Sequence, residues 1–368
     1  MNILVMQPRK NLTYAYFSSE QRTPLVRGQL DSYRVSVREN SRLVEELDLI
    51  RRRCEDAVLF EKPDALAIRV PYGGTEFPSH ALVTAETLQR MEALIGFAPL
   101  HIPPIVTLIQ CCQRVFPDLP VVLLFETAFF TALPRREYIY GLEANFTEKW
   151  ALRRYGFNGL FHEAAYAYLA EQQTAENKRD RSQPYRVLSI CLEPQPEIAA
   201  IVQNRAITVT SGVTPLEGLP GQTTCGELDS SIILTLAEKM NWGPEKINAV
   251  LTKESGLKGM AGSTIDWIDL FTSHASEVRQ ARDVVQYRFL LACGSSIAAM
   301  GGVDRLVFSG RYARMGDLLG SWLASRLPMI NGDGPSAEPP WVCYPVTLDR
   351  IMVDKAAMML LSLLARTC

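Results

Sequence analysis

An arginine beside a glycine pair is the first feature of the sequence that could do chemistry. Arg69 lies near the end of an apolar run, 65–70, that predicts a buried strand, and Gly73–Gly74 follow closely. A guanidinium offers five N–H donors in a planar fork that fits both oxygens of a carboxylate. Either an internal acid, for which Glu126 is the candidate, or a bound anion must satisfy these donors. The sequence therefore predicts a closed ion pair or an anion pocket at this strand end.

The eight cysteines suggest no further chemistry. None is spaced as Cys-x-x-Cys, so the pattern does not predict a zinc site, and so few cysteines in so long a chain do not form a disulfide scaffold. The adjacent Cys111 and Cys112 fall in an apolar helical pattern, which favours buried thiols. No metal ligands are predicted.

Length and composition indicate an ordinary α/β protein of two domains. The 368 residues are 47% hydrophobic and 21% charged, with 38 Lys and Arg against 40 Asp and Glu, which gives a net charge of −2. This balance argues against nucleic-acid binding through a broad basic surface. No apolar run approaches the ~20 residues of a membrane span, and the N-terminus lacks signal-peptide features, so we expect a cytoplasmic protein.

Two similar sets of elements follow one another along the chain. The first half predicts strands at 2–6, 14–17, 28–37, 65–70 and 120–125 and helices at 41–53, 84–95 and 104–116. The second half predicts strands at 187–192, 198–203, 206–209 and 305–309 and helices at 161–173, 230–240, 244–253, 281–300, 317–326 and 348–365.

The connecting segments carry their own signals. Asn204–Arg205 predicts a tight hairpin turn, 174–186 a flexible polar segment and 331–340 a Gly/Pro loop. Strand-rich openings in both halves favour two similar α/β lobes around a cleft.

Six segments, in order along the chain, resemble the acetate kinase family, which includes propionate and butyrate kinases. The match at 214–219 is letter for letter, and the others are Arg69–Gly74, Ala98–Pro103, Phe125–Phe130, Arg153–Gly159 and Gly226–Asp229. The resemblance implies two actin-like (ribonuclease H-like) lobes of the sugar kinase, Hsp70 and actin superfamily. The expected domains are 1–130 completed by a C-terminal helix at 351–368, and 131–350.

The resemblance also implies roles for the lobes and for residues of the acceptor side. The first lobe would bind the acceptor, and the second would be the former nucleotide side and the interface of a homodimer. Arg69 matches the carboxylate-contacting arginine, Pro71, Gly73 and Gly74 would shape the pocket, and His101 matches a histidine between the lobes. A salt-bridged arginine and a hydrogen-bonded structural histidine are the alternatives.

The catalytic positions depart from the family pattern. Glu126 replaces an aspartate, which moves the carboxylate by about 1 Å, and a misplacement of that size can cost ~10²-fold in rate. Asn158 replaces a histidine and cannot carry positive charge. Thr224 falls where the family has an arginine, and losing such a group in phosphoryl transfer can cost about 10³–10⁵-fold.

The nucleotide loops depart further. The family's three glycine-rich or serine-rich loops correspond here to 7–14, 191–197 and 310–315, in which prolines, Glu193, Glu197 and Arg311 replace small residues. Prolines remove N–H donors, and carboxylates repel phosphates. A late acid for Mg²⁺ falls near Asp349. We therefore expect no cofactor; ATP and Mg²⁺ belong only to the kinase alternative.

The retained acceptor side and the altered nucleotide loops leave three possible functions. The favoured one is a protein that has lost ordinary ATP-dependent carboxylate phosphorylation and acts as a binding or partner subunit for a small carboxylate or other small anion. The alternatives are an enzyme repurposed for a small acid or acyl compound and a divergent acyl kinase, so enzymatic activity is left open.

Overall fold

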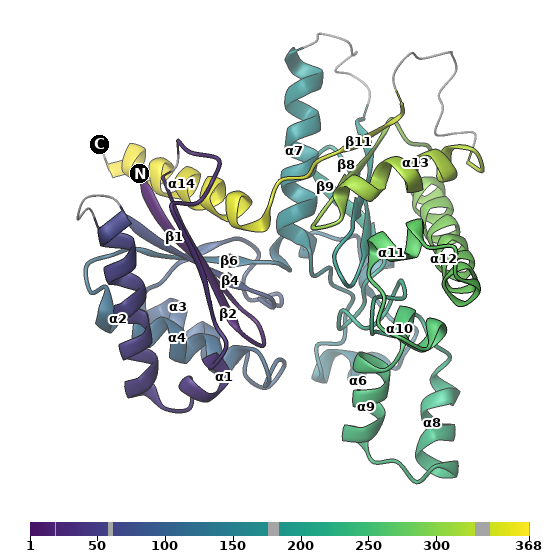
Figure 1. Ribbon diagram of the computed structural model, residues 1–368, viewed down its shortest axis with the longest axis horizontal. Helices are drawn as coiled ribbons and strands as arrows, with labels where there is room; N and C mark the ends of the chain where they lie inside the picture. The colour runs from purple at the N-terminus through teal and green to yellow at the C-terminus, as the bar shows by residue number, and fades with distance from the viewer. Residues whose placement is uncertain (19, 58–61, 176–183, 328–338, 368) are drawn as a thin grey trace. The chain divides into compact units, whose positions relative to one another are not determined.

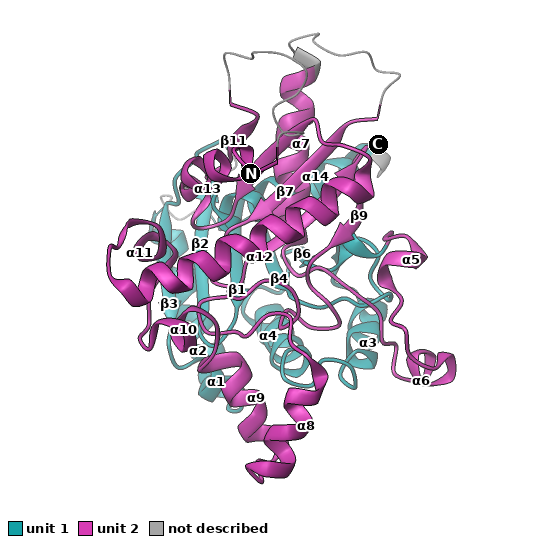
Figure 2. Ribbon diagram, turned by 90° about the vertical axis from the view of Figure 1, so that its right-hand side faces the viewer, with its two compact units in different colours: residues 1–131, 347–368 teal, residues 132–346 magenta. Residues whose placement is uncertain are grey.

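The chain forms two compact units, each with its own sheet. The computed structural model describes residues 1–18, 20–57, 62–175, 184–327 and 339–367 (Figure 1). Unit 1 comprises Met1–Thr131 and Thr347–Cys368 and unit 2 comprises Ala132–Val346, shown in teal and magenta in Figure 2. Within the described ranges, no helix combines the length and the apolarity that crossing a membrane requires.

Unit 1 is built on a six-stranded sheet in the order β3-β2-β1-β4-β6-β5. The strands β1, β2 and β3 form an antiparallel meander, β1, β4 and β6 run parallel, and β5 is antiparallel to β6. Its elements are β1 (Asn2–Pro8), β2 (Leu12–Ser18), β3 (Val26–Leu30), α1 (Tyr33–Ser36), α2 (Asn40–Ala57), β4 (Ala65–Val70), β5 (Ala81–Leu82), α3 (Ala85–Ala93), α4 (Ile102–Val115), β6 (Val121–Phe125), a 3₁₀ turn Ala128–Phe130 and α14 (Leu348–Thr367).

Helices cover both faces of this sheet, so its strands are apolar on both sides. Leu4 and Met6 of β1 pack in one core with α2 and α4, while α14 lies against β1, β4 and β6 on the other face (Figure 1). Ile3 and Val5, which alternate with Leu4 and Met6, are also fully buried. Continuous apolar runs are expected where a strand is buried on both faces.

Unit 2 repeats the same pattern with a five-stranded sheet in the order β11-β10-β7-β8-β9. Here β7, β8 and β9 form the antiparallel meander, and β10 and β11 run parallel to β7. The elements are α5 (Arg135–Tyr138), α6 (Ala144–Lys149), α7 (Gly159–Ala175), β7 (Arg186–Cys191), β8 (Glu197–Val202), β9 (Arg205–Val209), α8 (Ser230–Lys239), α9 (Pro244–Lys253), α10 (Gly256–Ala261), α11 (Trp267–Thr272), α12 (Ser276–Met300), β10 (Arg305–Ser309), a 3₁₀ turn Ala313–Met315, α13 (Gly316–Ala324) and β11 (Trp341–Cys343).

Two predicted elements differ from the structure. The strand predicted at 28–37 ends at Leu30, and Tyr33–Ser36 is helical, because Tyr33 turns inward and donates a hydrogen bond from its hydroxyl to the Pro104 carbonyl at 3.0 Å. The hairpin turn lies one residue earlier than predicted, at Gln203–Asn204, whose φ values of 50° and 63° fit a two-residue type I′ turn.

Two predicted loops lie largely outside the described residues. The segment predicted at 174–186 includes 176–183, and the loop predicted at 331–340 overlaps 328–338. By contrast, the strands at 65–70 and 305–309 and the helix at 244–253 have the predicted bounds.

Candidate functional site

A pocket of about 170 Å³ lies in unit 1, at the carboxyl ends of β1 and β4. Its polar lining consists of Arg9, Lys10, Arg34, Arg69 and His101, which come from the β1–β2 hairpin, α1, β4 and the start of α4. The remaining lining is mostly apolar. Ligands of α/β proteins commonly bind outside the carboxyl ends of parallel strands, so this pocket is the candidate site.

Arg69 is held in place by a buried ion pair. Its Nε lies 2.5 Å from Oε1 of Glu126, which follows β6 and is fully buried, while the Arg69 side chain is 11% exposed. The neighbouring strands β4 and β6 bring the two residues together, since Arg69 pairs with Leu124 in the register. Within the described ranges, the Nη atoms of Arg69 have no hydrogen-bond partner. Arg69 therefore donates from Nε to Glu126 within the protein and still lines the pocket.

The predicted pocket residues of the next segment have different roles. Pro71 lines the pocket. Gly73 is buried instead, with its N–H donating to Oγ1 of Thr127 at 2.9 Å, and a Cβ there would lie 2.7 Å from the ring of Phe125. Gly74 has a φ of +58°, which side chains rarely adopt. The two glycines thus shape the turn after β4 rather than the pocket wall.

His101 is the residue immediately before α4, makes no capping hydrogen bond with its side chain, and lines the pocket. Burial lowers the pKa of His101 below its ordinary value of 6.5, and the positive charges of Arg34 and Arg69 lower it further. The imidazole is therefore mainly neutral at neutral pH, as a hydrogen-bonding group rather than a cation.

Asn158 lies in unit 2, where a buried carboxylate holds the start of α7. The backbone N–H groups of Phe157 and Asn158 donate to the two oxygens of Glu197 at 2.8 and 2.9 Å. Nε2 of His162 lies 3.2 Å from the same carboxylate, and Nδ1 of His162 is 2.8 Å from the Ser189 hydroxyl. The sequence predicts only that Glu197 repels phosphates, because the backbone N–H of Asn158 that it accepts from is 39 residues away.

Two loops of unit 2, which the sequence resemblance places at phosphate-binding positions, are joined to each other. The Arg311 N–H donates to Oε1 of Glu193 at 2.9 Å, and the Tyr312 N–H donates to the Leu192 carbonyl at 2.9 Å. Gly310 has a φ of +88°, and a Cβ there would lie 2.7 Å from the Leu192 carbonyl oxygen. The backbone of the loop after β10 is therefore bonded to the loop after β7.

The late acidic residue singled out in the sequence is engaged within unit 1. Asp349, in the first turn of α14, accepts hydrogen bonds from the Gln7 side chain and from Nη2 of Arg27, the latter at 2.9 Å. Across the described part of the chain, no group of three or more His, Cys, Asp or Glu side chains is arranged to hold a metal ion.

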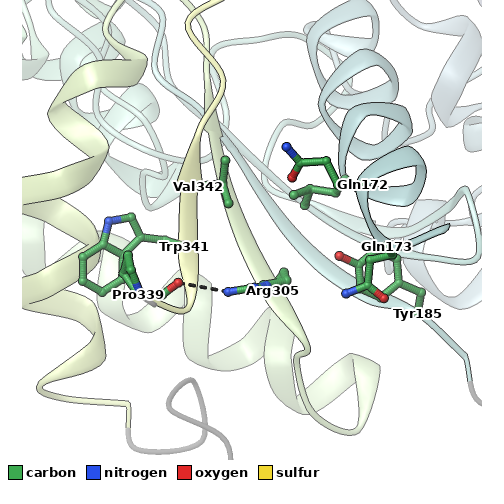
Figure 3. A pocket seen from close by; sticks show the side chains of 8 residues that line it. Gln172, Gln173, Tyr185, Arg305, Pro339, Trp341 and Val342 are labelled. Atoms are coloured by element: carbon green, nitrogen blue, oxygen red, sulfur yellow. Dashed lines mark hydrogen bonds between the residues drawn. The ribbon is translucent and has the colours of Figure 1, made fainter. Parts of the chain in front are cut away.

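A second pocket, of about 230 Å³, lies in unit 2 between the end of α7 and the strands β10 and β11. Figure 3 shows the amides of Gln172 and Gln173 on one side and Trp341 and Val342 on the other, with Arg305 bonded to the Pro339 carbonyl at 3.0 Å. This pocket is lined by none of the functional residues that the sequence predicts, so it is not part of the candidate site.

Comparison with known proteins identifies relatives over most of the chain. The Acetokinase family model matches residues 40–314. The chain is 34% identical over 253 residues to an acetate kinase of Halothermothrix orenii, covering 68% of this chain and 62% of the relative. It is 33% identical over 271 residues to an acetate kinase of Thermoanaerobacterium thermosaccharolyticum, covering 73% and 66%. The matched part thus spans less than two thirds of these relatives.

Solved structures share the fold over nearly the whole chain. Acetate kinase from Porphyromonas gingivalis aligns with a TM-score of 0.80 at 22% identity, covering 98% of this chain and 99% of that one. A propionate kinase from Francisella tularensis aligns with a TM-score of 0.76 at 24% identity, covering 96% and 97%. These likenesses confirm the predicted fold class of two actin-like α/β lobes.

Proposed function

The chain belongs to the acetokinase family, and from this premise we propose that it binds a small carboxylate or similar anion in the unit 1 pocket without ATP-dependent phosphoryl transfer. The observation that carries the proposal is the hydrogen bond from the Arg311 N–H to the Glu193 carboxylate. Open backbone N–H groups are what phosphate-binding loops offer. Here the protein's own carboxylate occupies that donor.

The nucleotide loops fit ATP poorly for three reasons. The loop after β7 contains Pro194 and Pro196, which have no N–H, and it brings Glu193 towards the loop after β10. A like-charge pair at ~4 Å costs about 1 kcal/mol in water and about 4 kcal/mol at an effective dielectric of 20. Pro8 likewise removes a donor at the end of β1. We assign no reaction step to ATP.

The position expected to hold Mg²⁺ fits a cation poorly as well. Asp349 is paired with Arg27, whose charge opposes a nearby divalent ion. A bound Mg²⁺ would have to displace this arginine and the Gln7 side chain from the same carboxylate. This arrangement supports binding without metal-assisted transfer.

The acceptor side supports carboxylate binding. The Nη atoms of Arg69 and the imidazole of His101 can donate to a carboxylate, while Pro71 and Leu100 supply an apolar wall for a short carbon chain. The same retained pocket favours the second candidate, a divergent acyl kinase. The two candidates differ in nucleotide binding.

The first prediction concerns nucleotide. Isothermal titration of MgATP into the full chain should give no binding heat at millimolar nucleotide, because phosphate donors are absent or already bonded. Acetate or butanoate should give measurable heat under the same conditions, and a catalytically active acetate kinase serves as the positive control. A micromolar dissociation constant for MgATP, or acyl phosphate formation, would contradict the proposal and favour the acyl kinase.

We also propose a homodimer through unit 2, formed by the exposed apolar side chains of α8. This helix has no buried side chain, and Ile232, Ile233 and Leu234 are 42%, 38% and 61% exposed. Large apolar side chains that are exposed next to one another favour an interaction surface. The segment 214–219 is bonded within unit 2 instead, since Glu217 accepts a hydrogen bond from Arg154 at 2.6 Å.

The second prediction tests this interface. Sedimentation at micromolar concentration should give twice the chain mass of 41.1 kDa, and Ile232→Glu with Leu234→Glu should yield monomers, because burying charge at an apolar interface is costly. Leu49→Glu, at an exposed position of α2 in unit 1, is the matched control and should stay dimeric. A wild-type monomer at high micromolar concentration would rule the dimer out.

A further inference from the structure

The unit 1 pocket carries more positive charge than one carboxylate needs. Arg9, Lys10, Arg34 and Arg69 all line it, and no acidic side chain of the described residues does so. Glu126 is fully buried on the Nε side of Arg69 and compensates for that one charge. Lys10 and Arg34 therefore add two exposed positive charges around a space of about 170 Å³. Walls of a single charge focus the field inside a pocket and favour ligands of opposite charge.

The cations approach the pocket from different elements. Arg69 lies at the end of β4 and is largely buried. Arg34 lies on α1 and Lys10 in the β1–β2 hairpin, and both are exposed. Arg34 and Arg69 line the pocket together with His101, and their positive charges lower the pKa of its imidazole. Lys10 and Arg34 form no ion pair with any residue that the structure describes. The pocket thus has a buried anchor and a separate exposed cationic rim.

We propose that the ligand of this pocket is a small organic dicarboxylate, with one carboxylate bound by the Nη atoms of Arg69 and the other by Arg34 and Lys10. This inference rests on the proposed binding function and deepens it. At ~30 Å³ per water, the pocket holds about six water molecules, which suits a four-carbon diacid but not a nucleotide. Its carbon chain would lie against Pro71 and Leu100.

The test compares two ligands that differ at one end only. Succinate and butanoate have the same number of carbons, and a methyl group in butanoate replaces the second carboxylate. Isothermal titration into the full chain at pH 7.5 and constant low ionic strength should give at least tenfold tighter binding of succinate. Added KCl should lower the affinity for succinate more steeply than the affinity for butanoate, because salt screens the interaction between exposed charges.

Two variants test whether Arg34 and Lys10 bind the second carboxylate of succinate. Arg34→Gln should reduce the succinate-to-butanoate affinity ratio below about threefold, and Lys10→Gln should reduce it partly. Arg38→Gln removes the same charge from an exposed arginine that does not line the pocket, so it should keep the wild-type ratio. Thermal melting of each variant checks that the fold is unchanged, which the exposure of all three side chains leads us to expect.

The outcomes separate this inference from the proposed function. Equal affinities for succinate and butanoate would overturn the inference that the ligand is a dicarboxylate, as would an unchanged succinate-to-butanoate affinity ratio in Arg34→Gln. Either result leaves the proposed carboxylate binding in place. Inorganic phosphate that binds as tightly as succinate overturns it in favour of a phosphate site. Absence of binding by either carboxylate overturns the proposed function together with the inference.

Discussion

Replacing Arg69 with alanine is expected to destabilise the protein by about 3–5 kcal/mol, because it leaves a fully buried carboxylate without its cationic partner. Glu126 is 0% exposed, and its Oε1 lies 2.5 Å from Nε of Arg69. A carboxylate removed from water is costly unless a charge and hydrogen bonds compensate for it. Urea unfolding of the full chain, followed by circular dichroism, measures the change in the free energy of unfolding.

The matched control removes both members of the pair. Arg69→Met with Glu126→Leu removes both charges of this pair, so the free energy of unfolding of the double variant should return to within about 1–2 kcal/mol of wild type. Both variants lack the Nη donors, so neither should bind a carboxylate. A loss of less than 1 kcal/mol in Arg69→Ala would show that Glu126 does not depend on this arginine.

The double variant has a further use, because it separates stability from binding. A single change at Arg69 alters both the fold and the pocket, so weak carboxylate binding by Arg69→Ala alone would be ambiguous. A stable double variant that fails to bind carboxylate would assign the binding to the Arg69 guanidinium. The ion pair thus does not close the pocket, since only the Nε edge is used.

Replacing Glu197 with alanine should cost about 2–4 kcal/mol, because it leaves two backbone N–H groups at the start of α7 without an acceptor. An unsatisfied donor that is fully buried costs about 1–3 kcal/mol, and these two are part-buried. The start of a helix also favours a negative charge, which the substitution removes. Chemical unfolding monitored by tryptophan fluorescence provides the measurement.

Two further variants make the Glu197 prediction specific. Glu197→Gln keeps one acceptor oxygen, so its loss should be smaller than that of alanine. Glu227→Ala removes a carboxylate that is 76% exposed and 3.9 Å from Arg288, and it should change stability by less than about 0.5 kcal/mol. Equal stability of Glu197→Ala and wild type would falsify the capping role.

The two units use one strand pattern for different purposes. In unit 1 the carboxyl ends of β1 and β4 border an open cationic pocket. At the corresponding ends of β7 and β10 in unit 2, Glu193 and the backbone of Arg311 and Tyr312 bond to one another. The same architecture therefore borders a pocket lined by cations in one unit and bonds the corresponding loops to each other in the other.

Local signals in the sequence were sufficient for most elements of both sheets. Apolar runs such as 65–70 and 305–309 predict buried strands because both faces of these strands are covered by helices. The helix predicted at 84–95 is α3, and Thr84 caps its start, since its hydroxyl accepts from the Thr87 N–H. The strand predicted at 28–37 was wrong after Leu30, where a tertiary contact of Tyr33 outweighs strand propensity.

The sequence by itself determined which groups need partners, and the tertiary structure decided which partners they have. Arg69 at a buried strand end had to meet an acid or an anion, and the sequence named Glu126 as the candidate. Only the pairing of β4 with β6 brings Nε of Arg69 to Glu126 while Arg69 still lines the pocket. Arg34 reaches the same pocket from α1, 35 residues earlier in the chain. Such convergence depends on chain reversals and packing between distant segments, which residue types and local periodicity do not encode.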